Sequence, residues 1–146
     1  MPQFSANLGF LWADEPLDHA IALAARAGFD AVEAHWPYAV PPDRVKAALR
    51  DAGLPLLGIN TVRGGQNGDF GLAACPDRKD EALAAIDQAL DYAEQVEAEA
   101  VHIMAGRVQG KEADRQYRKA LEYALGRANG RTLLTEPLNP MDVPGY

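Results

Sequence analysis

The chain has 146 residues, of which 48% are hydrophobic and 24% are charged, a balance typical of one folded globular domain over residues 1–146. Its formal net charge is −7 and its basic residues are spread along predicted helix faces, so we expect neither nucleic acid nor a membrane as a partner. The single cysteine, Cys75, can form no intrachain disulfide and the N-terminus lacks a signal-peptide pattern, which together predict a cytoplasmic protein.

Short apolar runs alternate with amphipathic segments along the chain. The predicted strands are residues 4–12, 31–34, 54–59, 100–104 and 132–135. The predicted helices run from Pro16 to Gly28, from Pro42 to Gly53, from an N-cap at Asp77 with Asp80 at N3 to about Glu97, and along Tyr117 to Leu125 with closure at Asn129-Gly130. This order predicts an α/β fold with a parallel sheet.

One connection, residues 62–76, is much longer than the others. It contains Gly64, Gly65, Gly68 and Gly71. A loop of this length inside a compact domain is usually functional. We therefore predict a functional loop, and loops of this kind are often lids.

Two architectures fit the alternation, a doubly wound open sheet and part of an eight-stranded barrel. No strand is followed by a glycine-rich phosphate-binding turn. Polar residues instead follow one strand after another: Glu33, His35, Asn60, Thr61, His102, Glu136 and Asn139. Because strand ends converge at the mouth of a barrel, we predict a parallel (β/α) barrel of the TIM type, with about five strands and four helices of an incomplete barrel.

Glu136 is the first candidate for chemistry. It follows the apolar strand at residues 132–135 and precedes Pro137, a place where a carboxylate is costly to bury without a cation or hydrogen-bond donors. Coordination of Mg²⁺ or Mn²⁺ would provide such a partner. The competing interpretation is a helix cap or a salt-bridged carboxylate.

Five further residues are candidates for substrate binding. His102 lies inside an apolar strand, where a hydrogen-bonded core histidine is the alternative explanation. Glu33 and His35 are two residues apart, which places both on one side of their strand. Asn60 and Asn139 follow the third and fifth strands and carry amides that suit a polyol or a carboxylate, although Asn60 could equally cap its loop.

Several segments together resemble the hydroxypyruvate isomerase family, a branch of the xylose-isomerase-like barrels. They are Phe4 to Leu8, Ala27 to Glu33, Val101 to Gly106, Leu134 to Pro140 and the loop at residues 60–78. The match keeps one register over the whole chain. It implies a (β/α)₈ barrel that converts hydroxypyruvate to 2-hydroxy-3-oxopropanoate, with Mg²⁺ or Mn²⁺ stabilising an enediolate and carboxylates moving the proton.

The resemblance makes Glu136 the first catalytic and metal-binding glutamate. The other metal ligands and the second catalytic glutamate of this family belong to later strands, so the resemblance implies a site that this chain alone leaves incomplete. An open inner face and two free strand edges also predict self-association or a missing C-terminal half.

Alternatives remain open at this point. A ketose 3-epimerase or another sugar isomerase would use the same barrel and a small sugar substrate. An inactive half-barrel that serves in binding or assembly is the alternative of another class. A DNA-repair nuclease of the same superfamily is the weakest option, because the chain lacks a basic face.

Overall fold

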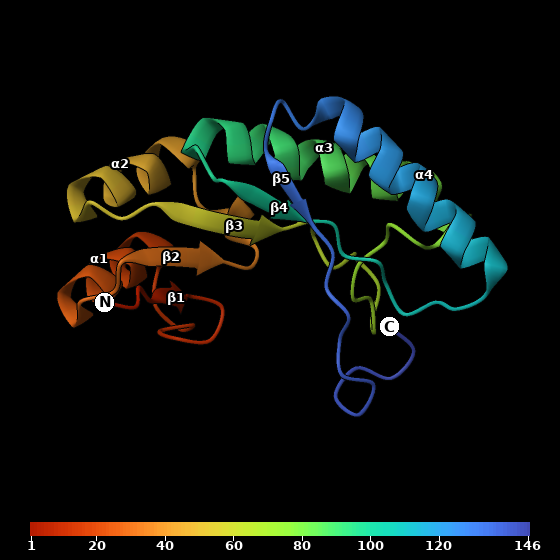
Figure 1. Ribbon diagram of the computed structural model, residues 1–146, viewed down its shortest axis with the longest axis horizontal. Helices are drawn as coiled ribbons and strands as arrows, with labels where there is room; N and C mark the ends of the chain where they lie inside the picture. Colours follow the sequence, from red (N-terminus) through yellow and green to blue (C-terminus); the bar gives the residue numbers. More distant parts are fainter. The chain divides into compact units, whose positions relative to one another are not determined.

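A computed structural model describes all 146 residues (Figure 1). Strands and α-helices alternate in the order β1 (Ser5–Asn7), α1 (Leu17–Ala27), β2 (Ala31–Ala34), α2 (Pro42–Ala52), β3 (Leu56–Asn60), α3 (Lys79–Val96), β4 (Ala100–His102), α4 (Lys111–Arg127) and β5 (Thr132–Leu134). Two short 3₁₀ helices, η1 (Pro37–Ala39) and η2 (Pro76–Arg78), lie in the connections. The predicted alternation is therefore confirmed.

The strand order decides between the two predicted architectures. The sheet has the order β1-β2-β3-β4-β5, and the pairs β1–β2 and β2–β3 are parallel. A doubly wound sheet reverses its strand order at a switch point, whereas the wall of a (β/α) barrel follows the sequence. The order seen here confirms the barrel-type prediction, and the five strands do not close into a complete barrel.

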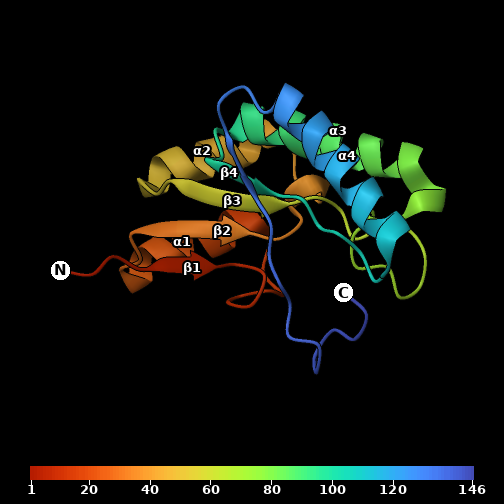
Figure 2. The same ribbon diagram turned by 45° about the vertical axis from the view of Figure 1, so that its right-hand side comes forward.

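The chain divides into two compact units, residues 1–59 with 91–100 and residues 60–90 with 101–146. In the first unit, α1 and α2 cover one face of β1 to β3 (Figure 2). Both helices end as predicted, at Gly28 and Gly53, whose φ angles of 85° and 68° suit a residue without a Cβ atom. The core of this unit includes Ile21, Val45 and Ile59.

The second unit contains most of α3, the end of β4, α4 and β5. Leu72, Ala82 and Ala85 form a buried cluster, with Val62 packed against it. The hydroxyl of Tyr123 in α4 donates to the carboxylate of Asp87 in α3, at 2.9 Å and 3.0 Å to the two oxygens. Since Val62 and Leu72 belong to the long loop and Ala82 and Ala85 to α3, the buried cluster packs the loop at residues 62–76 onto the start of α3.

Two local predictions are wrong. The first strand, predicted over residues 4–12, ends at Asn7, because the Asn7 carbonyl accepts hydrogen bonds from the amides of Phe10 and Leu11 and so starts a turn. Asp77 does not cap α3. It lies inside η2, which begins with Pro76 and has no side-chain cap.

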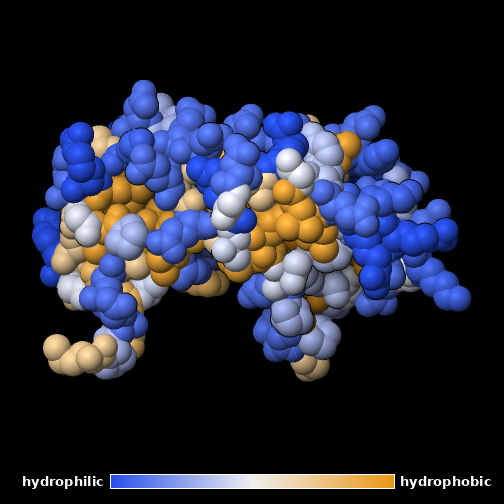
Figure 3. All heavy atoms as spheres, turned by 45° about the horizontal axis from the view of Figure 1, so that its top comes forward, coloured by the Kyte–Doolittle hydropathy of each residue, from blue (hydrophilic) through white to orange (hydrophobic).

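The exposed surface carries scattered apolar side chains. Figure 3 shows a face dominated by hydrophilic residues with apolar patches between them. Leu125 in α4 is 65% exposed, whereas the buried positions of that helix are Ala113, Gln116, Ala120 and Ala124. No helix combines the length and the apolar character that a membrane span requires.

Candidate functional site

The structure brings together two of the predicted site residues in the second unit. His102 ends β4 and is buried, whereas Glu136 comes two residues after β5 and its side chain is 59% exposed. The His102 Nδ1 atom lies 3.8 Å from the Glu136 Oε2 atom. An accessible carboxylate therefore stands beside a buried imidazole, as the placement of both residues at strand ends predicts.

Tyr146 extends this site beyond the residues predicted from sequence. Its hydroxyl accepts a hydrogen bond from the Ala105 amide at 3.1 Å, just after β4. Burial raises the pKa of the Tyr146 hydroxyl, and the negative charge of Glu136 raises it further. The ring of Tyr146 meets Phe70 edge to face, with centroids 5.9 Å apart, so this tyrosine links the chain after β5 to the long loop.

Two arginine side chains pack against the ring of Phe70. The guanidinium carbon of Arg63 lies 4.4 Å from the ring centroid, and that of Arg107 lies 5.5 Å from it. Both distances are within the range of a cation–π contact. Arg63 follows the end of β3 and Arg107 follows the end of β4, so two strand-end loops place positive charge on one ring.

Backbone hydrogen bonds join the loop after β3 to the loop after β4. Gly71 and Ala105 form an antiparallel bridge, and the amides of Ala73 and Ala74 donate to the carbonyls of Met104 and Ala105 at 3.2 Å and 2.8 Å. The Gly71 amide also donates to the Arg63 carbonyl at 2.7 Å. The loop predicted to be functional is thus held in place along its second half.

Asp69 and Arg78 anchor the tip of the loop. The Arg78 Nη1 atom donates to both oxygens of Asp69, at 2.7 Å and 2.8 Å, and the other side of the guanidinium binds Glu81. Asp69 also accepts the Gln66 amide at 2.9 Å. The side chains of Asp69 and Arg78 are only 14% and 15% exposed, so Asp69 is not the solvated loop carboxylate that its sequence context predicts.

Replacing Asp69 with asparagine is expected to destabilise the chain at pH 7, with a deficit that shrinks as the pH falls. The hydrogen bonds from Arg78 hold the pKa of Asp69 below its usual range in the folded chain. In the unfolded chain the pKa returns to about 3.9. The stabilisation is therefore complete above that value and is lost as the pH falls through the lower folded value. Urea unfolding of both chains between about pH 7 and pH 3 measures this trend.

The control for this experiment is Asp14→Asn, which changes an exposed carboxylate elsewhere in the chain. It is expected to leave the unfolding free energy close to that of the parent at every pH. A deficit for Asp69→Asn that stays constant down to about pH 3 would contradict the ion-pair explanation.

Glu33 and His35 belong to the first unit. Glu33 is half-buried in β2, where its carbonyl accepts the Leu8 amide at 2.8 Å. The His35 ring packs against Phe10 and Trp36, with centroids 4.9 Å and 5.1 Å away. His35 also lines a pocket of about 410 Å³ in this unit, so it remains a candidate for binding.

The two predicted asparagines differ in their surroundings. Asn139 binds within its own turn, where its side-chain amide donates to Asp142 at 2.8 Å and its side-chain oxygen accepts the Met141 amide at 3.0 Å. Asn60 is half-buried at the end of β3. Its neighbour Thr61 is buried, and its hydroxyl accepts the Met104 amide at 3.0 Å, which makes Thr61 part of the scaffold.

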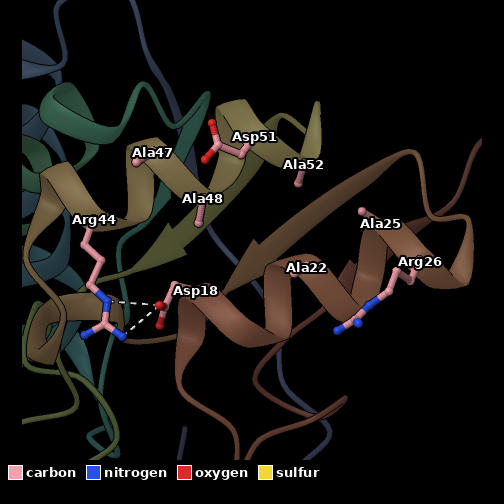
Figure 4. A pocket seen from close by; sticks show the side chains of 9 residues that line it. All are labelled: Asp18, Ala22, Ala25, Arg26, Arg44, Ala47, Ala48, Asp51 and Ala52. Carbon is pink, nitrogen blue, oxygen red and sulfur yellow. Dashed lines mark hydrogen bonds and ion pairs between the residues drawn. The ribbon is translucent and has the colours of Figure 1, made fainter.

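A larger pocket lies between α1 and α2, away from the strand ends (Figure 4). Its volume is about 670 Å³ and alanines form most of its wall. Its charged residues are Asp18, Arg26, Arg44 and Asp51. Asp18 accepts hydrogen bonds from Nε and Nη2 of Arg44 at 2.9 Å and 2.8 Å, and Asp51 is bound by Arg50. Because alanines form its wall and both of its carboxylates are bound by arginines, this pocket is not a candidate for metal binding or proton transfer.

Glu136 and His102 offer an oxygen and a nitrogen donor, both of which Mg²⁺ or Mn²⁺ accepts. No group of three or more His, Cys, Asp or Glu side chains in the 146 residues is arranged to hold a metal ion. The pair therefore fits part of a ligand set.

Comparison with known proteins gives consistent matches. A family model described as a xylose isomerase-like TIM barrel matches residues 21–146. A Xenopus laevis protein named "Putative hydroxypyruvate isomerase" is 37% identical, over 95% of this chain and 55% of its own length. A Cupriavidus necator protein named 2-oxo-tetronate isomerase is 36% identical, over 100% of this chain and 59% of its own length.

A solved structure described as an AP endonuclease, family 2, from Brucella melitensis superposes with a TM-score of 0.93. It is 33% identical, and the match covers 100% of this chain and 59% of that chain. The chain spans about half the length of the curated relatives it matches.

Proposed function

Because the chain belongs to the xylose isomerase-like TIM barrel family, we propose that it supplies the N-terminal part of an isomerase site for a small hydroxy-oxo acid. The resemblance that the sequence carries is thereby confirmed at the level of the family. The observation that supports the proposal most is the exposed carboxylate of Glu136, which follows β5 and stands 3.8 Å from the imidazole of His102.

The proposed reaction converts hydroxypyruvate to 2-hydroxy-3-oxopropanoate. A proton leaves C3 of hydroxypyruvate, its electron pair forms the C2–C3 double bond of an enediolate, and the C2 carbonyl oxygen takes up the negative charge. A proton then adds to C2 while the C3 hydroxyl gives up its O–H proton and becomes a carbonyl. The C2 oxygen takes up a proton and becomes the hydroxyl of the product. Mg²⁺ or Mn²⁺, when bound, would supply a positive charge that stabilises the enediolate oxygens.

Glu136 is proposed to act as a ligand to this ion and as a carboxylate that carries the proton. Its exposure leaves it accessible to a small substrate. His102, buried beside it, positions the carboxylate and contributes a nitrogen donor. Glu33, His35, Asn60 and Asn139 remain proposed substrate-binding residues. The further ligands and the second proton-transfer carboxylate are proposed to come from a C-terminal half or from another copy.

Glu136→Gln is expected to abolish Mg²⁺- or Mn²⁺-dependent conversion of hydroxypyruvate and to weaken Mn²⁺ binding. The substitution keeps the size of the side chain and removes the charge that a hard cation and a proton transfer require. Turnover is followed with the 146-residue chain by product analysis, and Mn²⁺ affinity by titration calorimetry. The matched control is Glu122→Gln, an exposed glutamate on α4.

Wild-type turnover that survives in Glu136→Gln, or Mn²⁺ binding equal in both chains, would contradict the role of Glu136. If the isolated chain binds Mn²⁺ through Glu136 without turnover, the site requires residues from another segment or copy. Sedimentation of the chain with and without Mn²⁺ then determines whether copies associate.

The second candidate substrate is 2-oxo-tetronate, since the relative from Cupriavidus necator is named for its isomerisation. Turnover measured with hydroxypyruvate, 2-oxo-tetronate and a ketohexose distinguishes an isomerase of these acids from the ketose 3-epimerase alternative. An oligomer with no Mn²⁺ affinity and no turnover would favour the binding or assembly module. Cleavage of an abasic DNA duplex would favour the nuclease.

A further inference from the structure

The charge of the strand-end loops differs from that of the chain as a whole. The chain carries a formal net charge of −7, yet two arginines share the ring of Phe70. Arg78, the other arginine near this loop, is already bound by two carboxylates, Asp69 and Glu81. Arg107 takes part in no hydrogen bond or ion pair, and its one interaction is with Phe70.

Stacking on an aromatic ring leaves the in-plane donors of a guanidinium available. Arginine carries five N–H donors in a planar fork, a geometry that matches a carboxylate and allows two parallel hydrogen bonds. A cation–π contact holds the face of the group, and for Arg107, whose one interaction is with Phe70, it leaves those edges exposed. Arg63 and Arg107 are both exposed, so an anion can reach them.

The scaffold beneath these arginines is rigid. The Arg63 carbonyl accepts the Gly71 amide, and Gly106, which precedes Arg107, packs against the Gly71 carbonyl so closely that an added Cβ would stand 2.6 Å from that oxygen. Phe70 lies between Asp69, which is held by Arg78, and Gly71, which pairs with Ala105. Two cations held on one ring by fixed loops are preorganised for a ligand.

We propose that Arg107, stacked on Phe70 beside the positive charge of Arg63, forms a subsite for the carboxylate of the substrate. The proposal rests on the function proposed above and adds the residues that select an acid over a neutral sugar. Phe70 also contacts Tyr146, whose hydroxyl has its pKa raised by burial and, to a smaller extent, by the charge of Glu136. In this proposal the carboxylate of a small hydroxy-oxo acid binds at the arginines and its reacting carbons face Glu136. Phe70 is a positioning residue in this arrangement.

Hydroxypyruvate and dihydroxyacetone make a matched pair of probes. They share a hydroxymethyl ketone and differ in one group, a carboxylate in the first and a second hydroxymethyl in the second. Binding of each to the 146-residue chain is measured by calorimetric titration, with circular dichroism to verify that each variant is folded. The wild-type chain is expected to bind hydroxypyruvate more tightly, with a preference that falls as salt is added.

Arg107→Gln and Arg63→Gln are each expected to weaken hydroxypyruvate binding by about tenfold or more and to leave dihydroxyacetone binding unchanged. The matched control is Arg115→Gln, an exposed arginine on α4. Phe70→Leu is expected to reduce the preference for the acid, and Phe70→Tyr, which keeps the ring, is expected to restore it. A loss of folding would impair Phe70→Tyr and Phe70→Leu alike.

Glu136→Gln separates this proposal from the function above. It is expected to retain the preference for the acid, because the arginines are unchanged. If Glu136→Gln keeps turnover while Arg107→Gln removes the preference, the subsite stands and the catalytic role of Glu136 fails. Equal binding of the two probes by the wild-type chain, no binding of hydroxypyruvate, or an unchanged preference in both arginine variants would overturn the subsite.

Discussion

Replacing Gly71 with alanine is expected to lower the free energy of unfolding by about 3 kcal/mol or more. Gly71 has a φ angle of 110°, a region that residues with a Cβ atom rarely adopt. An added Cβ would stand 2.5 Å from the Met104 carbonyl oxygen, which is backbone and cannot turn aside. The bridge between Gly71 and Ala105 would have to open to relieve the contact. Urea unfolding measures the loss.

Gly126→Ala provides the control for this substitution. Gly126 lies inside α4, and an added Cβ would meet no atom within 4 Å. Alanine there is expected to stabilise the chain by up to about 1 kcal/mol, because glycine is a poor residue in a helix interior. If Gly71→Ala were as stable as the parent chain, the two loops would not be held by this close approach.

The order of the fold could be predicted because its signals are local. Apolar residues at helical spacing mark α1 and α2, and Gly28 and Gly53 end those helices because each adopts a left-handed φ. β2 was predicted with its observed bounds, since a short apolar run stands between a glycine turn and a polar loop. β1 was predicted too long, because the apolar side chains of Phe10 and Leu11 continue the run beyond the turn at Asn7.

The candidate site could be predicted only where strand ends alone define it. Glu136 and His102 follow or end strands that are neighbours in the sheet, so the topology brings them together. Arg63, Phe70 and Arg107 were missed because their proximity depends on a long loop folding back onto the next one. The available signal was that both arginines lie within a few residues of a strand end.

The ion pair of Asp69 was also missed because it depends on how the long loop folds back. A carboxylate in a glycine-rich loop is typical of a solvated turn, and nine residues separate it from Arg78. Their contact requires the loop to return to η2, just before α3, which composition does not reveal. Thr61 was predicted only as one of the polar residues that follow strands, whereas its burial places the hydroxyl inside the scaffold.

Replacing Thr61 with valine is expected to destabilise the chain by about 1–3 kcal/mol, because the change leaves a buried amide without its acceptor. Thr61 is 3% exposed, and its hydroxyl accepts the Met104 amide at 3.0 Å. Met104 is 2% exposed, so water cannot replace the lost bond. Valine matches the shape of threonine, so the loss of the hydroxyl is isolated from any change of packing. Thermal and urea unfolding measure the difference.

Thr61→Ser distinguishes the hydroxyl from the methyl group. Serine keeps the acceptor for the Met104 amide and removes one buried methyl, which costs about 0.8 kcal/mol. Thr61→Val is therefore expected to be the less stable of the two, although it buries more apolar surface. The opposite order would mean that packing, not this hydrogen bond, holds the end of β3 against the chain after β4. Because Arg63 follows Thr61 by two residues, Thr61→Val is also expected to weaken the preference for hydroxypyruvate over dihydroxyacetone.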